Sequence, residues 1–91
     1  MIKWIIKPSG YCPVQAEGYF RGKYFYFRSR WSTSSIEFAN SEQDWDDNKI
    51  IKRYILFKDK EPAAGWIPKW LAYVLIYKGC LKYLLKIKSN D

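Results

Sequence analysis

Tyrosine and arginine side chains concentrated between positions 12 and 31 are the residues of this chain best suited to chemistry. They lie in the stretch CPVQAEGYFRGKYFYFRSRW, where they alternate with phenylalanines and small residues. Tyrosine rings beside guanidinium groups can stack on bases and pair with phosphates, and each stacked base contributes about 1–3 kcal/mol. The candidate binding residues are Gln15, Glu17, Tyr19, Tyr24, Tyr26, Arg28, Arg30 and Trp31.

Two other roles are open to the same residues. Tyr–Tyr contacts and a Glu17–Arg28 contact between neighbouring strands would stabilise a solvated sheet face, at about 0.2–1 kcal/mol each. The face could instead form a contact between copies of the chain. Because Glu17 is the only acidic residue of the stretch and arginines lie beside it, we expect an ion-pair partner rather than a general base.

A β-hairpin is the element that would bring these side chains to one surface. Arg21-Gly22 is its simplest turn, because glycine supplies the positive φ angle of a tight turn. The resulting pairs are Phe20 with Lys23, Tyr19 with Tyr24, Glu17 with Tyr26, and Gln15 with Arg28. A register shifted by one residue would mix the phenylalanines with the tyrosines. The preferred register places Val14, Ala16, Phe20, Phe25 and Phe27 on one face and the candidate binding residues up to Arg30 on the other.

The hairpin also resembles a known motif. At Cys12-Pro13-Val14-Gln15-Ala16-Glu17-Gly18 and Phe25-Tyr26-Phe27-Arg28-Ser29-Arg30 the sequence resembles a family of short, uncharacterised bacterial and phage-borne proteins. Their motif reads C-P-V-Q-A-E-G, a turn, F-Y-F-R-x-R and then W, and Trp31 has the last place here. The resemblance implies a hairpin and a phage or mobile-element context. It implies no activity or mechanism.

Hydrophobic periodicity predicts the remaining strands. Residues 1–7 alternate Ile2, Trp4 and Ile6 with Lys3, Ile5 and Lys7, which indicates a strand with one buried face. A polar connection at 31–35 leads to a short strand at Ile36–Ala39, and 40–49 is an acidic loop around Trp45. That ring either contacts a partner or folds back onto the core. Asp46 or Asn48 could cap a helix at 50–58, but the Ile, Tyr and Phe residues there favour a strand.

The clearest predicted element is a helix from Pro68 to about Lys88, since proline suits the first helical position. Lys78, Lys82 and Lys86 form a solvated stripe on it. We expect the opposite side to be buried, namely Trp70, Tyr73, Val74, Tyr77, Cys80, Leu81, Leu84 and Ile87. Leu71, Leu75 and Leu85 widen the apolar arc beyond the needs of one small sheet, which indicates a second contact with a homodimer partner or the target. Gly79 costs roughly 1 kcal/mol relative to alanine unless close packing offsets it.

These elements predict a single α+β domain over residues 1–91. Its sheet is expected to be four-stranded and mainly antiparallel, a meander with a central hairpin, with the C-terminal helix packed on one face. We expect the helix to cover the phenylalanine face of the hairpin and to leave the Tyr and Arg face open.

Composition narrows the classes of function. Sixteen Lys and Arg against nine Asp and Glu give a net charge of +7, which favours an acidic protein surface, an anionic nucleotide or nucleic acid as partner. The chain has no histidine and no motif for phosphate binding, metal binding or nucleophilic catalysis, so we expect no enzyme, metal or cofactor. Cys12 and Cys80 are either buried thiols or one bridge. No apolar run approaches the ~18 residues of a membrane span, and the N-terminus does not read as a signal peptide, so we expect a cytoplasmic protein without a membrane partner.

Two functional hypotheses follow. The first is a non-enzymatic binding protein, phage or mobile-element encoded, that acts as an inhibitor or sponge against a host defence component through its basic and aromatic sheet face. The alternative is a small module that binds RNA or single-stranded DNA with the same Tyr and Arg side chains.

Overall fold

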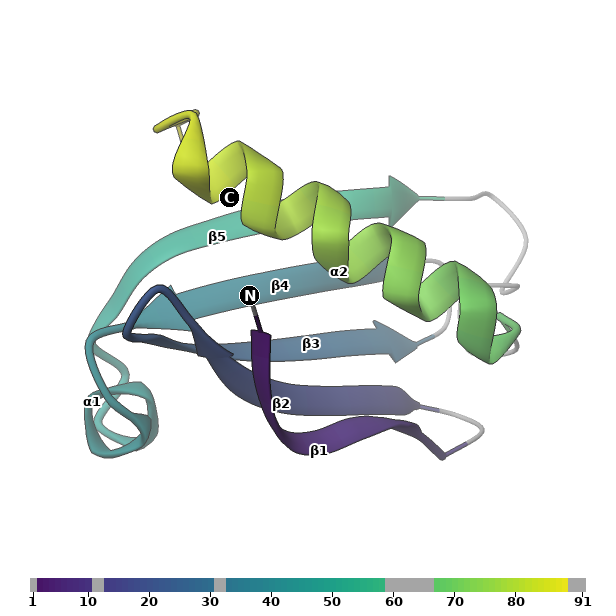
Figure 1. The fold of residues 1–91 in the computed structure, drawn as a ribbon, viewed down its shortest axis with the longest axis horizontal. Helices are drawn as coiled ribbons and strands as arrows, with labels where there is room; N and C mark the ends of the chain where they lie inside the picture. The colour runs from purple at the N-terminus through teal and green to yellow at the C-terminus, as the bar shows by residue number, and fades with distance from the viewer. Residues whose placement is uncertain (1, 11–12, 31–32, 59–66, 89–91) are drawn as a thin grey trace.

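Five antiparallel strands and two helices make up the fold, seen in a computed structural model that describes residues 2–10, 13–30, 33–58 and 67–88 (Figure 1). In chain order the elements are β1 (Ile2–Ser9), β2 (Val14–Phe20), β3 (Lys23–Arg30), β4 (Thr33–Ala39), α1 (Glu42–Asp46), β5 (Ile50–Lys58) and α2 (Lys69–Leu84). The strand order is β1-β2-β3-β4-β5, so every connection joins neighbours. The α+β class and the antiparallel meander are confirmed. The expected four strands are wrong, because β1 and β5 both join the sheet as its edges.

The β2–β3 hairpin has the predicted register. Phe20 pairs with Lys23, Tyr19 with Tyr24, Glu17 with Tyr26, and Gln15 with Arg28. Arg21 and Gly22 have φ angles of 52° and 80°, so both central residues are left-handed, as a type I′ turn requires. Local turn chemistry and side-chain alternation therefore place the phenylalanines on one face and the tyrosines on the other.

Three local predictions are corrected. β4 begins at Thr33 instead of Ile36, because the buried hydroxyls of Ser29 and Ser34 lie 2.6 Å apart and satisfy each other across the strand pair. The acidic segment contains helix α1, whose first turn is capped by the Ser41 hydroxyl accepting from the Asp44 N–H at 3.1 Å. The third correction concerns β1, where bulges leave Ile6 exposed although alternation placed it on the buried side. By contrast, the strand predicted at residues 50–58 is confirmed.

Helix α2 lies across the phenylalanine face of the sheet (Figure 1). The core between them consists of Val14, Ala16, Phe25, Phe27, Ile36, Phe38, Tyr54, Leu56, Ile67, Ala72, Leu75, Ile76 and Cys80. The predicted contact between helix and phenylalanine face is therefore confirmed. The helix ends at Leu84, short of the predicted Lys88.

The side of α2 that is buried differs from the predicted one. Its buried residues are Ala72, Leu75, Ile76, Gly79 and Cys80, and Tyr73 is half-buried. Trp70, Val74, Tyr77, Leu81, Leu84 and Ile87, which we expected to be buried, are exposed instead. Gly79 explains the difference: a Cβ atom there would lie 2.6 Å from Cγ2 of Ile36, so the helix contacts the sheet through its glycine. Close packing thus offsets the low helix propensity of Gly79.

Cys80 is a free thiol in the core, and burial raises its pKa to about 12. Cys12 and Trp31, which also figured in the predictions, lie outside the described residues. Neither helix in the described ranges has the length and apolarity that crossing a membrane requires.

Candidate functional site

The candidate binding residues lie on the sheet face opposite α2, which we call the outer face. Strand pairing arranges this face in rows, because side chains on the same face of paired strands lie side by side. The rows are Tyr19–Tyr24–Ala39, Glu17–Tyr26–Glu37–Arg53, Gln15–Arg28–Ser35–Ile55 and Arg30–Thr33–Lys58. The structure therefore brings together the predicted residues from Gln15 to Arg30, while Trp31 is not described.

Helix α1 covers one end of the outer face. The Trp45 ring lies 4.6 Å from the ring of Tyr26 and 5.8 Å from that of Tyr24, between ring centroids. Tyr24 is consequently 0% exposed, although it points away from the core cluster. The expectation of a fully open Tyr and Arg face is therefore wrong at this end. Trp45 does fold back, but onto the tyrosines.

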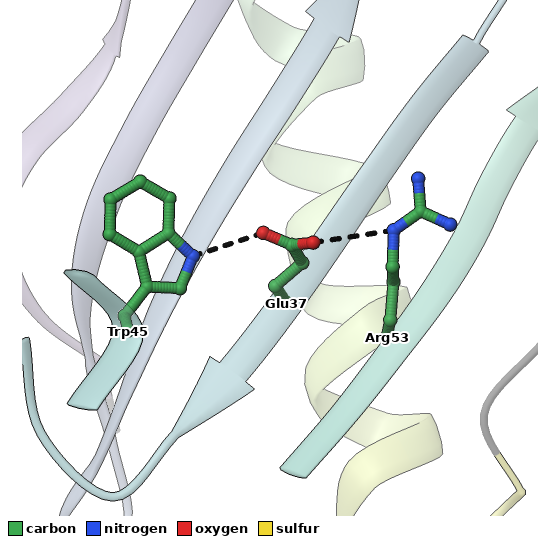
Figure 2. Close-up of polar contacts among 3 residues, drawn as sticks. All are labelled: Glu37, Trp45 and Arg53. Atoms are coloured by element: carbon green, nitrogen blue, oxygen red, sulfur yellow. Dashed lines mark hydrogen bonds and ion pairs between the residues drawn. The ribbon is translucent and has the colours of Figure 1, made fainter. Parts of the chain in front are cut away.

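Two carboxylates described on the outer face, Glu17 and Glu37, have partners within the fold. Glu37 accepts a hydrogen bond from Nε1 of Trp45 at 3.0 Å and forms an ion pair with Nε of Arg53 at 3.3 Å (Figure 2). Glu17 accepts a hydrogen bond of 2.6 Å from the Tyr24 hydroxyl. Burial, followed by the bond to Glu17, raises the pKa of Tyr24 well above its ordinary value. These carboxylates thus hold α1 and Tyr24 in place.

The other end of the outer face is basic, and we call it the arginine end. It consists of Gln15, Arg28, Arg30, Thr33, Ser35 and Lys58. Gln15, Arg30 and Lys58 are exposed, and Arg28, Thr33 and Ser35 are half-buried. The described residues of these two rows include no carboxylate. Cationic, hydroxyl and amide groups on adjacent strands can donate hydrogen bonds to one anionic group.

Arg28 is the central residue of the arginine end. Its Nε is buried, and it has no hydrogen-bond partner among the residues that the structure describes. Leaving a buried donor unpaired costs about 1–3 kcal/mol, and more for a charged group. Its positive charge opposes the rise that burial causes in the pKa of Tyr26, the tyrosine two positions before it. An anion bound beside the guanidinium of Arg28 would lower the cost of holding this charge in a half-buried position.

Sequence reasoning missed Thr33, Ser35, Glu37, Trp45, Arg53 and Lys58 as members of the outer face. The alternation of Thr33, Ser35 and Glu37 was a usable signal, but it required extending β4 through its serines. Trp45 carried no periodic signal, because its position depends on where the single turn of α1 docks.

Two further hollows adjoin the hairpin turn. One, of about 490 Å³, is lined by Lys3, Tyr19, Arg21 and Gly22. The other, of about 340 Å³, lies at the end of α2 and is lined by Arg21, Ile51, Lys52, Tyr83, Leu84 and Lys86. The described residues that line each of them include cations and no acidic residue. Tyr19 therefore keeps access to solvent beside cations, which Tyr24 does not.

A scan against protein-family models, a search of curated protein sequences and a search of solved structures each gave no match. Among the described residues, no group of three or more Cys, Asp or Glu could hold a metal ion.

Proposed function

We propose that this protein is a non-enzymatic binding protein that holds an anionic group of its partner at the arginine end. The observation that carries the proposal is the buried Nε of Arg28, which has no hydrogen-bond partner among the described residues and lies in a row with Gln15 and Ser35. Arg30 and Lys58 lie on the adjacent row and add positive charge. A carboxylate or phosphate placed over these rows would be attracted by the guanidinium of Arg28 and by the cations beside it.

An acidic protein surface is the partner class that we favour. Base stacking needs open aromatic faces, but Tyr24 is buried and Trp45 packs against Tyr26. The arginine end instead combines guanidinium, hydroxyl and amide donors, which suit carboxylates presented by a folded partner. Action as an inhibitor or sponge against a host defence component is the biological role we attach to this surface, and it is supported by the resemblance of the hairpin motif to phage-borne proteins.

The test uses a fluorescent polyglutamate peptide as the acidic probe, at low salt. Arg28→Ala combined with Arg30→Ala should weaken binding at least about tenfold, because a hydrogen bond to a charged group contributes about 1.5–3 kcal/mol. Lys78→Ala combined with Lys88→Ala removes the same charge from exposed positions on the α2 side and should change binding less than about twofold. An equal loss of binding in both double variants would show that net charge alone, and not the arginine end, determines peptide binding. A large drop in unfolding temperature for the arginine pair would assign those side chains to stability.

Nucleic-acid binding remains the second candidate, and Tyr19 is the observation that favours it. Tyr19 lines a hollow with Lys3 and Arg21, so a base could stack there while cations contact phosphates. An oligo-dT probe tests this directly. Binding that weakens steeply with salt and is lost in Tyr19→Ala supports this second function, whereas no binding at low salt excludes it. If neither polyglutamate nor oligo-dT binds at low salt, both proposals fail.

A further inference from the structure

The solvent-facing side of α2 exposes a row of large apolar side chains, which we call the α2 seam. Its members and their exposed fractions are Trp70 (66%), Val74 (52%), Tyr77 (55%), Leu81 (54%) and Leu84 (46%). They lie on the side of the helix opposite Ala72, Leu75, Ile76 and Gly79, which face the sheet. Figure 1 shows α2 lying over one face of the sheet, and the exposed fractions place this row on the solvent side of the helix. Exposed apolar patches of this kind mark interaction surfaces in soluble proteins.

The spacing along the α2 seam is that of helix–helix packing. Successive members are separated by 4, 3, 4 and 3 residues, so Val74 and Leu81 occupy a positions of a heptad and Trp70, Tyr77 and Leu84 occupy d positions. A straight helix drifts only about 20° per heptad from this repeat, so two heptads stay aligned with one partner helix. A helix lying on a membrane would carry lysines opposite its apolar row, but that side of α2 is buried against the sheet.

We infer that the α2 seam is the contact of a homodimer in which two copies of α2 pack antiparallel. The two-fold axis crosses the seam side of the helix at the level of residues 75 and 76. In this register each aromatic d residue faces an aliphatic a residue of the second copy. Trp70 packs on Leu81, and Tyr77 packs on Val74. Large side chains opposite smaller ones give interdigitated layers, and the two-fold axis makes the same contacts twice.

The residues that flank the seam favour this register. Leu71 and Lys78 occupy e positions, and e positions face each other in an antiparallel pair. With the axis near residue 75, Lys78 lies beside Leu71 of the second copy, whose apolar surface its aliphatic stem covers. With the axis near residue 79, the two Lys78 ammonium groups would face each other, and like charges repel. The charge of the helix thus selects between two registers that the apolar spacing alone would allow.

The size and charge of the interface predict a weak dimer. The seam and the exposed Leu85 offer roughly 500 Å² of apolar surface per copy, near the lower limit of specific interfaces. Each copy carries a net charge of +7, so the two copies repel at low salt. Salt should therefore strengthen the dimer. The inference goes beyond the proposed function, because the arginine ends lie on the other side of each sheet and remain accessible in the dimer.

Sedimentation velocity from about 5 to 500 μM, at low and high salt, tests the inference. We expect a monomer–dimer equilibrium whose dimer fraction rises with concentration and with salt. Leu81→Glu should raise the dimer dissociation constant at least about tenfold, because a carboxylate would be buried at the contact. Ile6→Glu, at an equally apolar exposed position of β1, should leave the equilibrium unchanged. Arg28→Ala, which tests the proposed function, should also leave it unchanged.

Cross-linking tests the register. A short bismaleimide should join Val74→Cys protein to Tyr77→Cys protein in a mixture faster than it joins either variant to itself. Fastest joining of Tyr77→Cys to itself would indicate a parallel pair and overturn the antiparallel register.

Three outcomes overturn the dimer itself. The first is a monomer at every concentration and salt. The second is a dimer that salt weakens, which would indicate contact between oppositely charged surfaces in place of the seam. The third is binding to vesicles with about one-third anionic lipid that is lost in Leu81→Glu, which would assign the seam to a membrane surface.

Discussion

Gly79 is the residue that determines which side of α2 is buried. The helix has leucine, isoleucine, valine or an aromatic residue on every side, so apolarity does not favour one orientation strongly. A side chain at position 79 would collide with Ile36, whereas glycine lets the two backbones approach. The buried side is therefore centred on the smallest residue of the helix and not on its largest ones.

Gly79→Ala should accordingly destabilise the protein. Alanine gains about 1 kcal/mol in helix propensity, but overpacking a core typically costs about 1–3 kcal/mol, and the clash is with a buried β-branched side chain. We expect a net loss of up to about 2 kcal/mol in the free energy of unfolding, measured with urea. Lys78→Ala, at the adjacent exposed position, should stay within about 0.5 kcal/mol of wild type. A Gly79→Ala protein more stable than wild type would show that the helix can shift away from Ile36 at no cost.

At the scale of elements, α1 is a five-residue helix with a large effect on the outer face. It has no buried residue of its own, yet its Trp45 contacts Tyr24 and Tyr26 and donates to Glu37. Glu37 in turn links α1 to β5 through Arg53 (Figure 2). One tryptophan therefore separates the outer face into a covered tyrosine end and a more exposed arginine end.

Trp45→Ala should uncover Tyr24 and lower the free energy of unfolding by about 1–3 kcal/mol, because a large aromatic contact and one hydrogen bond are lost. The expected readout besides stability is tyrosine ionisation, followed by ultraviolet absorbance as the pH is raised. Tyr24 should ionise at lower pH in the variant, since burial is the main cause of its raised pKa.

The matched control for this prediction is Trp70→Ala. It removes the same side chain from the exposed α2 seam and should leave monomer stability and tyrosine ionisation unchanged. If Trp45→Ala behaves like Trp70→Ala, the docking of α1 onto the tyrosines contributes nothing to the fold.

For the whole molecule, the buried tyrosine hydroxyls and the buried cysteine thiol predict a loss of stability at alkaline pH. Burial raises the pKa values of Tyr24, Tyr26 and Tyr54, and raises that of Cys80 to about 12. The folded protein thus keeps protons that the unfolded chain releases above about pH 9 for cysteine and pH 10 for tyrosine. The free energy of unfolding should therefore keep its full value below about pH 9. Above that pH it should fall by up to about 1.4 kcal/mol per pH unit for each such group.

Urea unfolding between pH 7 and pH 11 measures this slope. Tyr24→Phe removes one of the groups and should flatten the decline above pH 10, after a constant loss at neutral pH from the missing bond to Glu17. A free energy of unfolding that does not change up to pH 11 would contradict the burial of these groups.

Local patterns were sufficient for the hairpin, its register, the strand at 50–58 and the α+β class. Arg21-Gly22 specifies a tight turn, and alternation from Val14 to Phe27 then assigns each side chain to a face, since a one-residue slip would exchange the faces. The grouping of the candidate binding residues from Gln15 to Arg30 followed from this register alone. These features depend on residues close together in the chain.

Contacts between distant segments decided the rest. Helix α2 is apolar on most sides, so its periodicity did not specify the buried one, and the approach of Gly79 to Ile36 did. The Ser29–Ser34 bond extended β4 through residues that look like a connection, and the docking of Trp45 closed half of the outer face. The Tyr and Arg stretch was therefore recognisable as one surface from its own residues. Which part of that surface is open depends on α1 and β4, because burial is a property of what packs on a side chain and not of the side chain itself.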